Sequence, residues 1–412
     1  MEQVDVGKCK SKCMSLFDLV GPCLFLLDVY LDVRMVLSFY QQEDYVFMGL
    51  LTFILLGSSL LVNTFSLLWY LYDNDGTETR KENCVKNICP LIILHAFLFG
   101  FLSRYAGVLK TLICGICCGV YDAAGQTSPK HDLSILLLFD AFSESAPQLV
   151  LMLTIIFQRG DVNLIPLLKA FGSAAALSFS VTMYHRSLRS FLPDKNEQSW
   201  GSSVLYFLWN LLLIGSRVAA VALFASVFPC YIAAHFLCSW MVLFLCAWRL
   251  HTDFMESTGG ERLYKATIGI IWYFTWFNVV KGHTRSKRNI YHVWILVDNV
   301  ILCGVWIWQM KKSPPYFHFS IDPVVIFMVV TLLYILGLCL MVIYYKYCHP
   351  ILKQAECVER LKEPLKENDV DPIGFRSMGL ADNSSEPPER VNRRMKNLAD
   401  NFYYRPGSLM IP

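Results

Sequence analysis

Charged residues are scarce in this sequence. Only 17% of its 412 residues are Asp, Glu, Lys or Arg, whereas 55% are hydrophobic. Soluble domains carry about 25% charged residues, so this composition excludes a soluble protein and indicates a membrane protein with several spans. The net charge of +3 is too small to indicate nucleic-acid binding, because basic residues in short loops mainly report orientation in the membrane.

Catalytic and metal-binding motifs are also missing. The chain has no Walker loop, dinucleotide fingerprint, HExxH helix or nucleophile elbow, so we expect no enzyme. Most of the 15 Cys lie in apolar segments, and Cys114, Cys117 and Cys118 have no Cys/His partners at zinc spacing. We therefore expect no metal and no other cofactor.

Ten apolar segments follow the order two long, one short, two long, and then the same again. They lie at 15–40, 46–72, 88–103, 133–157, 162–184, 203–227, 229–249, 264–280, 291–310 and 322–347. The two short segments, 88–103 and 264–280, are near the lower length limit for a span and predict half-inserted segments. The fold class expected is an all-α polytopic membrane protein, with about eight transmembrane helices and two half-inserted segments in two parallel pseudo-symmetric repeats.

Loop charges orient this arrangement. The basic loops His185–Lys195 and Lys281–Arg288 predict a cytosolic side, and the predicted outer turns are short or nearly neutral apart from Lys311 and Lys312. Both termini are then cytosolic. The expected domains are a cytosolic N-terminus (1–14), a first membrane repeat (15–184), a cytosolic linker (185–202), a second membrane repeat (203–347) and a cytosolic tail (348–412).

The segment Leu136–Phe157 is long enough to span the membrane, yet it is not purely apolar. Asp140, Glu144 and Gln148 follow at four-residue spacing, which places them on one helical face. Carboxylates at membrane depth are costly unless they face protein, water or a cation, so this face is predicted to point away from lipid tails. Pro147 removes one backbone donor at the same place.

Charged residues lie inside other predicted spans as well. They are Asp28 and Asp32 in the first span, Arg217 in 203–227 and Asp298 in 291–310. The repeat relates Arg217 to the first pair, and Asp298 to Asp140 and Glu144, so we expect Arg217 to pair across the repeats with Glu144 or Asp140. The surplus carboxylates are expected to be protonated, exposed to water or close to cations. A structural network between the repeats and a direct role in moving headgroups or ions are both compatible with this pattern.

Histidines and aromatic residues in the spans have structural interpretations. His95, His235 and His292 are each isolated in apolar stretches, which favours hydrogen-bonded core or interface residues over ligands. The aromatic run 272–277 is predicted to anchor a half-inserted segment at the membrane interface.

The composition changes after Tyr347. Residues 350–412 are rich in charged residues, Asn and Pro, which predicts a mostly disordered cytosolic tail. Within it, Met395, Leu398 and Phe402 stand at helical spacing in Val391–Tyr404. We expect a short amphipathic helix there that docks on the cytosolic face of the bundle.

Four blocks of sequence resemble one known family. They are LFDAFSESAPQLVLMLTI (138–155), SSVLYFLWNLLLIGSRVAAVALFASVFPCYIAAHF (202–236), YFTWFNVVKGHTR (273–285) and NRRMKNLADNF (392–402). Together they are similar to the XK-related (Kell-associated XK) family, in particular to its apoptotic phospholipid-scramblase branch. The resemblance covers roughly residues 15–350 and the tail motif.

This resemblance implies a plasma-membrane protein with eight spans and two half-inserted helices. It implies energy-independent movement of phosphatidylserine and other phospholipids between leaflets after a caspase removes the tail, and a single-span chaperone such as basigin or neuroplastin. The intramembrane charges would form a graded path for lipid headgroups; by match these are Asp28, Asp32, Asp140, Glu144, Arg217 and Asp298. Phe47 matches an aromatic residue expected to gate the outer end.

The caspase site departs from the preferred DxxD pattern. Residues 368–371 read Asn-Asp-Val-Asp, and Pro372 directly after Asp371 is unfavourable for cleavage. Asp382 and Asp400 are the alternatives.

The sequence is therefore compatible with three functions. The first is a phospholipid scramblase whose acidic stripes lower the desolvation barrier for headgroups and whose tail helix braces the resting state. The second is a solute or ion transporter or channel, which requires a cavity enclosed between the repeats. The third is a non-transporting membrane subunit like the Kell partner, for which Cys230 is the nearest candidate for an extracellular linkage.

Overall fold

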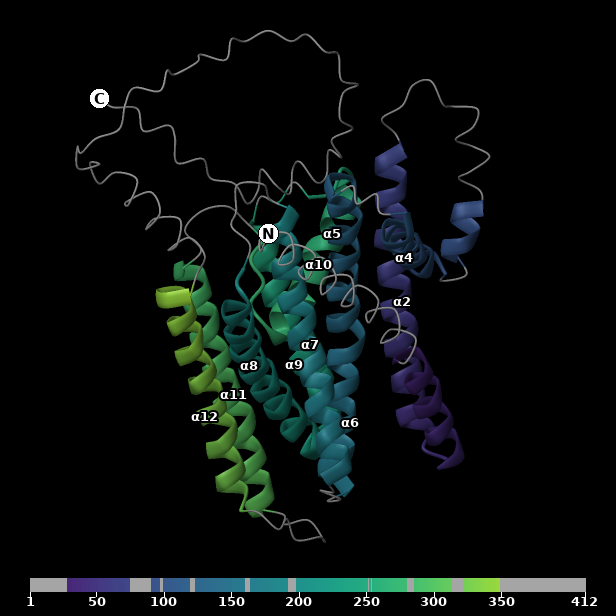
Figure 1. Cartoon of the computed structure of the whole chain (residues 1–412). Coiled ribbons are helices and arrows are strands. Elements are labelled where there is room, and N and C mark those ends of the chain that lie inside the picture. The colour runs from purple at the N-terminus through teal and green to yellow at the C-terminus, as the bar shows by residue number, and fades with distance from the viewer. Residues whose placement is uncertain are drawn as a thin grey trace, which may run out of the picture.

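The computed structural model confirms an all-α polytopic membrane protein (Figure 1). It describes residues 28–74, 90–96, 99–118, 123–159, 164–191, 198–250, 252, 254–279, 285–312 and 322–348. Within these ranges every regular element is a helix.

Six described helices are long and apolar enough to cross a membrane. They are Tyr45–Tyr72, His131–Arg159, Trp200–Val227, Pro229–Trp248, Arg285–Lys312 and Pro323–Cys348. In the order of the chain these correspond to α2 (Tyr45–Asn74), α5 (Ala123–Asp140) with η2 (Ala141–Ser145) and α6 (Ala146–Arg159), α8 (Trp200–Val227), α9 (Pro229–Trp248), α11 (Arg285–Lys312), and α12 (Pro323–Ile343) with η3 (Tyr344–Cys348).

Two further predicted spans are only partly comparable with these six. The helix at 28–41 is the described end of the predicted span 15–40. The helix α7 (Leu164–Phe191) has 28 residues, as α8 does, but it contains more polar residues. The total of eight spans therefore stays a prediction.

The two short segments do not form straight spans. In the first, the helix Pro90–Ala96 meets α4 (Gly100–Cys118) at a bend of 115°, which fits a broken span or a segment that returns to its own side. In the second, α10 (Thr258–Phe274) has only 17 residues and ends where Thr275 becomes extended. The carbonyl oxygen of Tyr273 then accepts a hydrogen bond from Arg217 on α8. The carboxyl end of α10 is thus buried inside the bundle.

The helix α8 is the centre of the bundle. It packs against α6, α7, α9, α11 and α12. Small residues permit this close packing: Gly337 of α12 lies so near that an added Cβ would be 2.8 Å from Leu213 Cδ2. The caps fit the helix ends, because Ser199 accepts from the Ser202 amide and Pro229 starts α9 directly after α8.

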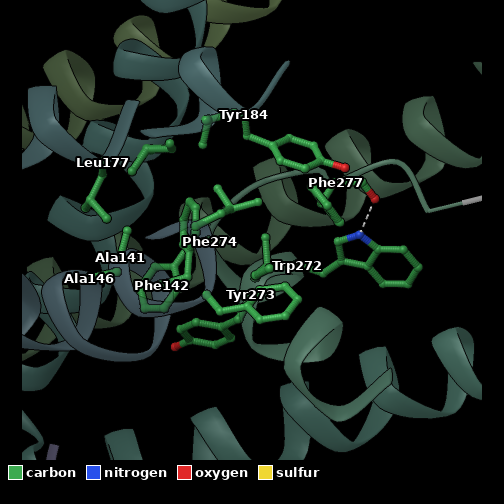
Figure 2. Packing of buried hydrophobic residues seen from close by; sticks show 14 of the residues in the cluster. Ala141, Phe142, Ala146, Leu177, Tyr184, Trp272, Tyr273, Phe274 and Phe277 are labelled. Atoms are coloured by element: carbon green, nitrogen blue, oxygen red, sulfur yellow. Dashed lines mark hydrogen bonds between the residues drawn. The ribbon is translucent and has the colours of Figure 1, made fainter. Parts of the chain in front are cut away.

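The predicted interfacial anchor at 272–277 is wrong. Trp272, Tyr273, Phe274 and Phe277 are buried in the main core, as Figure 2 shows. The Phe274 ring lies 6.2 Å from that of Phe142 in η2. The run follows the buried end of α10, so most of its rings fill space between helices and are not exposed to lipid.

Connections gather at two opposite ends of the bundle. The carboxyl end of α7 and the amino end of α11 lie at one end, and the α8–α9 junction lies at the other (Figure 1). This arrangement agrees with the orientation predicted from loop charge. Which end faces the cytosol stays a prediction.

Candidate functional site

A π-helical turn interrupts the long helix that carries the predicted acidic face. In η2 the Ala146 amide bonds to the Ala141 carbonyl, five residues back. Pro147 follows directly and has no amide hydrogen, which favours a change in hydrogen-bond register at this place. The turn is at the level of Asp140 and Glu144, and π-helical turns occur frequently at functional sites.

Four carboxylates converge on this turn. We call Asp28, Asp32, Asp140 and Glu144 the acidic cluster. Oxygen atoms of Asp28, Asp32 and Glu144 lie within 4.8 Å of one another. The side-chain amide of Gln148 donates to Asp32, which is only 6% exposed. The polar face that carries Glu144 and Gln148 is therefore directed toward the helix 28–41.

The fourth carboxylate connects the acidic cluster to α2. Ser58 of α2 donates to Asp140 Oδ1 at 3.1 Å and lies 2.7 Å from the Ser143 hydroxyl. The carboxylates of the cluster thus come from the helix 28–41, the end of α5 and the π-helical turn, while α2 and α6 supply the hydrogen-bond donors Ser58 and Gln148.

The acidic cluster presents carboxylate oxygens, which accept hydrogen bonds and bind cations. Carboxylates this close repel one another unless one is protonated or a cation lies between them. Three carboxylate oxygens at this spacing are suitable ligands for a hard cation, and they equally accept hydrogen bonds from an ammonium group.

A second polar site lies around Arg217 in the middle of α8. Its Nη1 donates to Asp298 Oδ2 at 2.6 Å and to Asn299 Oδ1 at 2.8 Å, and its Nε donates to the Tyr273 carbonyl at 3.0 Å. His235 Nε2 lies 3.2 Å from Asp298 Oδ1, and its Nδ1 lies 3.1 Å from the Tyr273 hydroxyl. We call these five residues the arginine site.

The charges of the arginine site are balanced by its surroundings. The guanidinium is fully buried, and Asp298 neutralises it. The carboxyl end of α10, where the helix dipole is negative, also points at this cation through the Tyr273 carbonyl. This combination of ion pair and hydrogen bonds is what a buried charge requires.

The predicted pairing of Arg217 with Glu144 or Asp140 is wrong. In the described part of the chain Arg217 pairs with Asp298, a residue of its own half. Among the described residues the arginine site is built from α8, α9, α10 and α11, whereas the acidic cluster is built from the helix 28–41, the end of α5 and η2. Phe142 of η2 packs against Phe274, the neighbour of Tyr273. An apolar contact thus lies between the two sites.

Phe47 lies in the first turn of α2, close to the turn that connects the helix 28–41 to α2. Its ring is 6.0 Å from that of Phe39. Both belong to a small apolar group that includes Leu51 and Ile155. Arg159 pairs with Asp44 at the same end. This position is compatible with the predicted gate, which stays a prediction.

Other predicted residues fall outside the described ranges. They are the caspase candidates Asp371, Asp382 and Asp400 and the tail-docking residues Met395, Leu398 and Phe402.

Sequence reasoning missed the polar partners. His235 was expected only as a hydrogen-bonded structural residue, Tyr273 only as part of the aromatic run 272–277, and Ser58 and Asn299 were not singled out. Asn299 had a weak signal because it follows Asp298 directly. Nothing in the local sequence of Tyr273 indicates that its carbonyl is a partner of Arg217, because that depends on where α10 ends.

Comparisons with known proteins identify the family of this chain. A family model for XK-related proteins matches residues 16–350. XK-related protein 8 of Tetraodon nigroviridis is 38% identical over 401 residues, which cover 94% of this chain and 95% of the relative. XK-related protein 8 of Pan troglodytes is 34% identical, with 93% and 92% covered. XK-related protein 9 of Tetraodon nigroviridis is 30% identical, with 71% and 80% covered.

Proposed function

The chain belongs to the XK-related family, and on that premise we propose that it is a phospholipid scramblase that exposes phosphatidylserine at the cell surface. It moves lipids without catalysing a covalent reaction and without a nucleotide. The plasma membrane is its place of action, with both termini in the cytosol. A basigin-like or neuroplastin-like single-span chaperone is the partner that the family resemblance suggests.

The observation that carries the proposal is an acidic cluster on a helix that otherwise faces lipid. On the helix 28–41 the residues beside Asp32 are apolar and exposed, with Leu31 at 50% and Val33 at 54%. Polar groups that cross hydrocarbon alone pay a large desolvation cost. A row of carboxylates at the edge of the bundle lowers this cost for a headgroup while the acyl chains stay in the bilayer.

The non-transporting subunit is the second candidate, because Cys230 is exposed at the α8–α9 junction. Such a subunit would link to a partner through this thiol. It would not move lipids when reconstituted alone.

Reconstitution tests the proposal directly. We expect the tail-trimmed chain, in liposomes that contain a fluorescent phospholipid, to let dithionite bleach almost all of the label. A Cys230→Ser variant is the matched control for the subunit hypothesis and should be equally active. Bleaching confined to the outer leaflet would contradict the scramblase proposal.

Tail cleavage is the proposed trigger, with a caspase as the protease. In cells driven into apoptosis, Asp371→Ala is expected to prevent the appearance of phosphatidylserine at the surface, and Asp382→Ala and Asp400→Ala serve as comparisons. Annexin binding measures the exposed lipid, and an immunoblot measures tail loss. Exposure without tail loss would rule out cleavage as the trigger.

A further inference from the structure

The arginine site contains nitrogen donors that have no acceptor among the described residues. These atoms are Arg217 Nη2 and Asn299 Nδ2. Both side chains are buried, at 0% and 4% exposure. A buried donor without an acceptor costs free energy. Two such donors in the arginine site therefore indicate that an acceptor binds there while the protein is active.

The two donors belong to side chains in direct contact. Arg217 Nη1 donates to Asn299 Oδ1 at 2.8 Å, so the unpaired guanidinium nitrogen and the unpaired amide nitrogen lie on two hydrogen-bonded side chains. Two adjacent donors, one of them charged, suit an anionic oxygen. Asp298 supplies such an oxygen to Arg217 Nη1, so a carboxylate of the protein itself is the resident anion of the site.

His235 stands at the rim of this site. As a neutral imidazole it donates from Nε2 to Asp298 and accepts at Nδ1 from the Tyr273 hydroxyl, since an ionised carboxylate only accepts. The side chains of His235 and Asp298 are 19% and 17% exposed, whereas Arg217 behind them is fully buried. The site is therefore reached past these two side chains.

The rim opens between two helices that face lipid. The helix α9 packs on α8 and α10, and α11 packs on α8 and α12. The contact of His235 with Asp298 bridges α9 and α11. On these two helices Leu237, Val297 and Ile301 are more than half exposed, at 56%, 51% and 55%. Asp298 is near the middle of α11, about 20 Å from either end of the helix, so polar atoms here meet the bilayer close to its centre.

We propose that His235 and Asn299, together with Arg217, bind the phosphodiester of a phospholipid headgroup when the Asp298 side chain turns away. This inference rests on the proposed function and assigns two further residues to it. The phosphate oxygens replace the carboxylate of Asp298 and occupy the unused donors, so the charge of Arg217 stays compensated. The acidic cluster, which offers only acceptors, is the complementary place for the amine of the headgroup.

Selectivity between lipids tests this assignment. Liposomes that contain the active, tail-trimmed chain are prepared with fluorescent phosphatidylcholine, phosphatidylserine or glucosylceramide, which has no phosphate. We expect His235→Phe and Asn299→Leu each to slow both phospholipids at least about tenfold relative to glucosylceramide, because a hydrogen bond to a charged group is lost. His235→Gln keeps a donor and is expected to restore most of the ratio.

The control is His292→Phe, which changes a histidine of α11 that contacts Tyr334 instead. It should leave the ratio between lipids as in the unaltered chain. If His235→Phe and Asn299→Leu slow all three lipids equally, the two residues are structural and the inference is overturned, whereas the scramblase proposal stands. If inorganic phosphate slows glucosylceramide as much as the two phospholipids in the unaltered chain, but has no effect on Asn299→Leu, the site holds the free ion and not the lipid phosphate, and the lipid assignment is overturned. Failure of the unaltered chain to move any lipid would contradict the proposed function itself.

Discussion

Replacement of Arg217 by methionine is expected to lower the free energy of unfolding by about 3–5 kcal/mol, because removal of one partner leaves a buried charge uncompensated. The guanidinium donates to Asp298, Asn299 and the Tyr273 carbonyl, so its loss also frees the carboxyl end of α10 inside the bundle. Thermal unfolding of the detergent-solubilised protein measures the change.

Two variants separate this effect from a general loss of charge. Arg159→Met breaks the exposed ion pair with Asp44 and should cost less than about 1 kcal/mol. Arg217→Met combined with Asp298→Leu removes both charges and should recover most of the lost stability. Equal losses in Arg217→Met and the double variant would show that packing, and not charge compensation, makes Arg217 important.

Neutralisation of the acidic cluster is expected to lower the rate of scrambling without lowering stability, in contrast to the replacement of Arg217. Asp32→Asn with Glu144→Gln should slow phospholipid scrambling about a hundredfold, since two hydrogen bonds to charged groups of about 1.5 kcal/mol each correspond to about two factors of ten in rate. Stability should stay the same or rise, because carboxylate oxygens that lie within 4.8 Å no longer repel one another. The measurements are dithionite bleaching in liposomes and thermal unfolding.

The matched control for this pair is Asp44→Asn, which removes a carboxylate at the end of the bundle where it pairs with Arg159. Its scrambling rate should be unchanged. An unaltered rate in the Asp32→Asn, Glu144→Gln variant would exclude the acidic cluster from the lipid path. A large fall in stability would instead show that the cluster holds the helices together.

Much of the acidic cluster was predictable from spacing. Asp140, Glu144 and Gln148 share one face of any regular helix, and a carboxylate at membrane depth must face something polar. What could not be predicted is the partner of that face. Ser58 and Asp32 contact this polar face because α2 and the helix 28–41 pack against it. A serine within an apolar helix gives no indication in the sequence of which residue it contacts.

The pairing of Arg217 shows the limit of reasoning from repeats. The repeat model relates the first and third long segments of the two halves, which are the segments that carry the charges. It could not decide whether a cation on one of them pairs within its half or across it. That depends on the side of α8 from which Arg217 projects, and on α10 ending beside it.

The sequence by itself determined that the chain is a helical membrane protein, where its long apolar segments lie, and which charged residues stand inside them. Length, hydropathy and helical period are local properties, so they can be read residue by residue. Only the tertiary structure decided that these charges form two separate sites, with Asp298 paired to Arg217 in one of them and the contact of Phe142 with Phe274 between them. Contacts between residues far apart in the chain depend on how whole helices pack, and that information is not contained in any single segment.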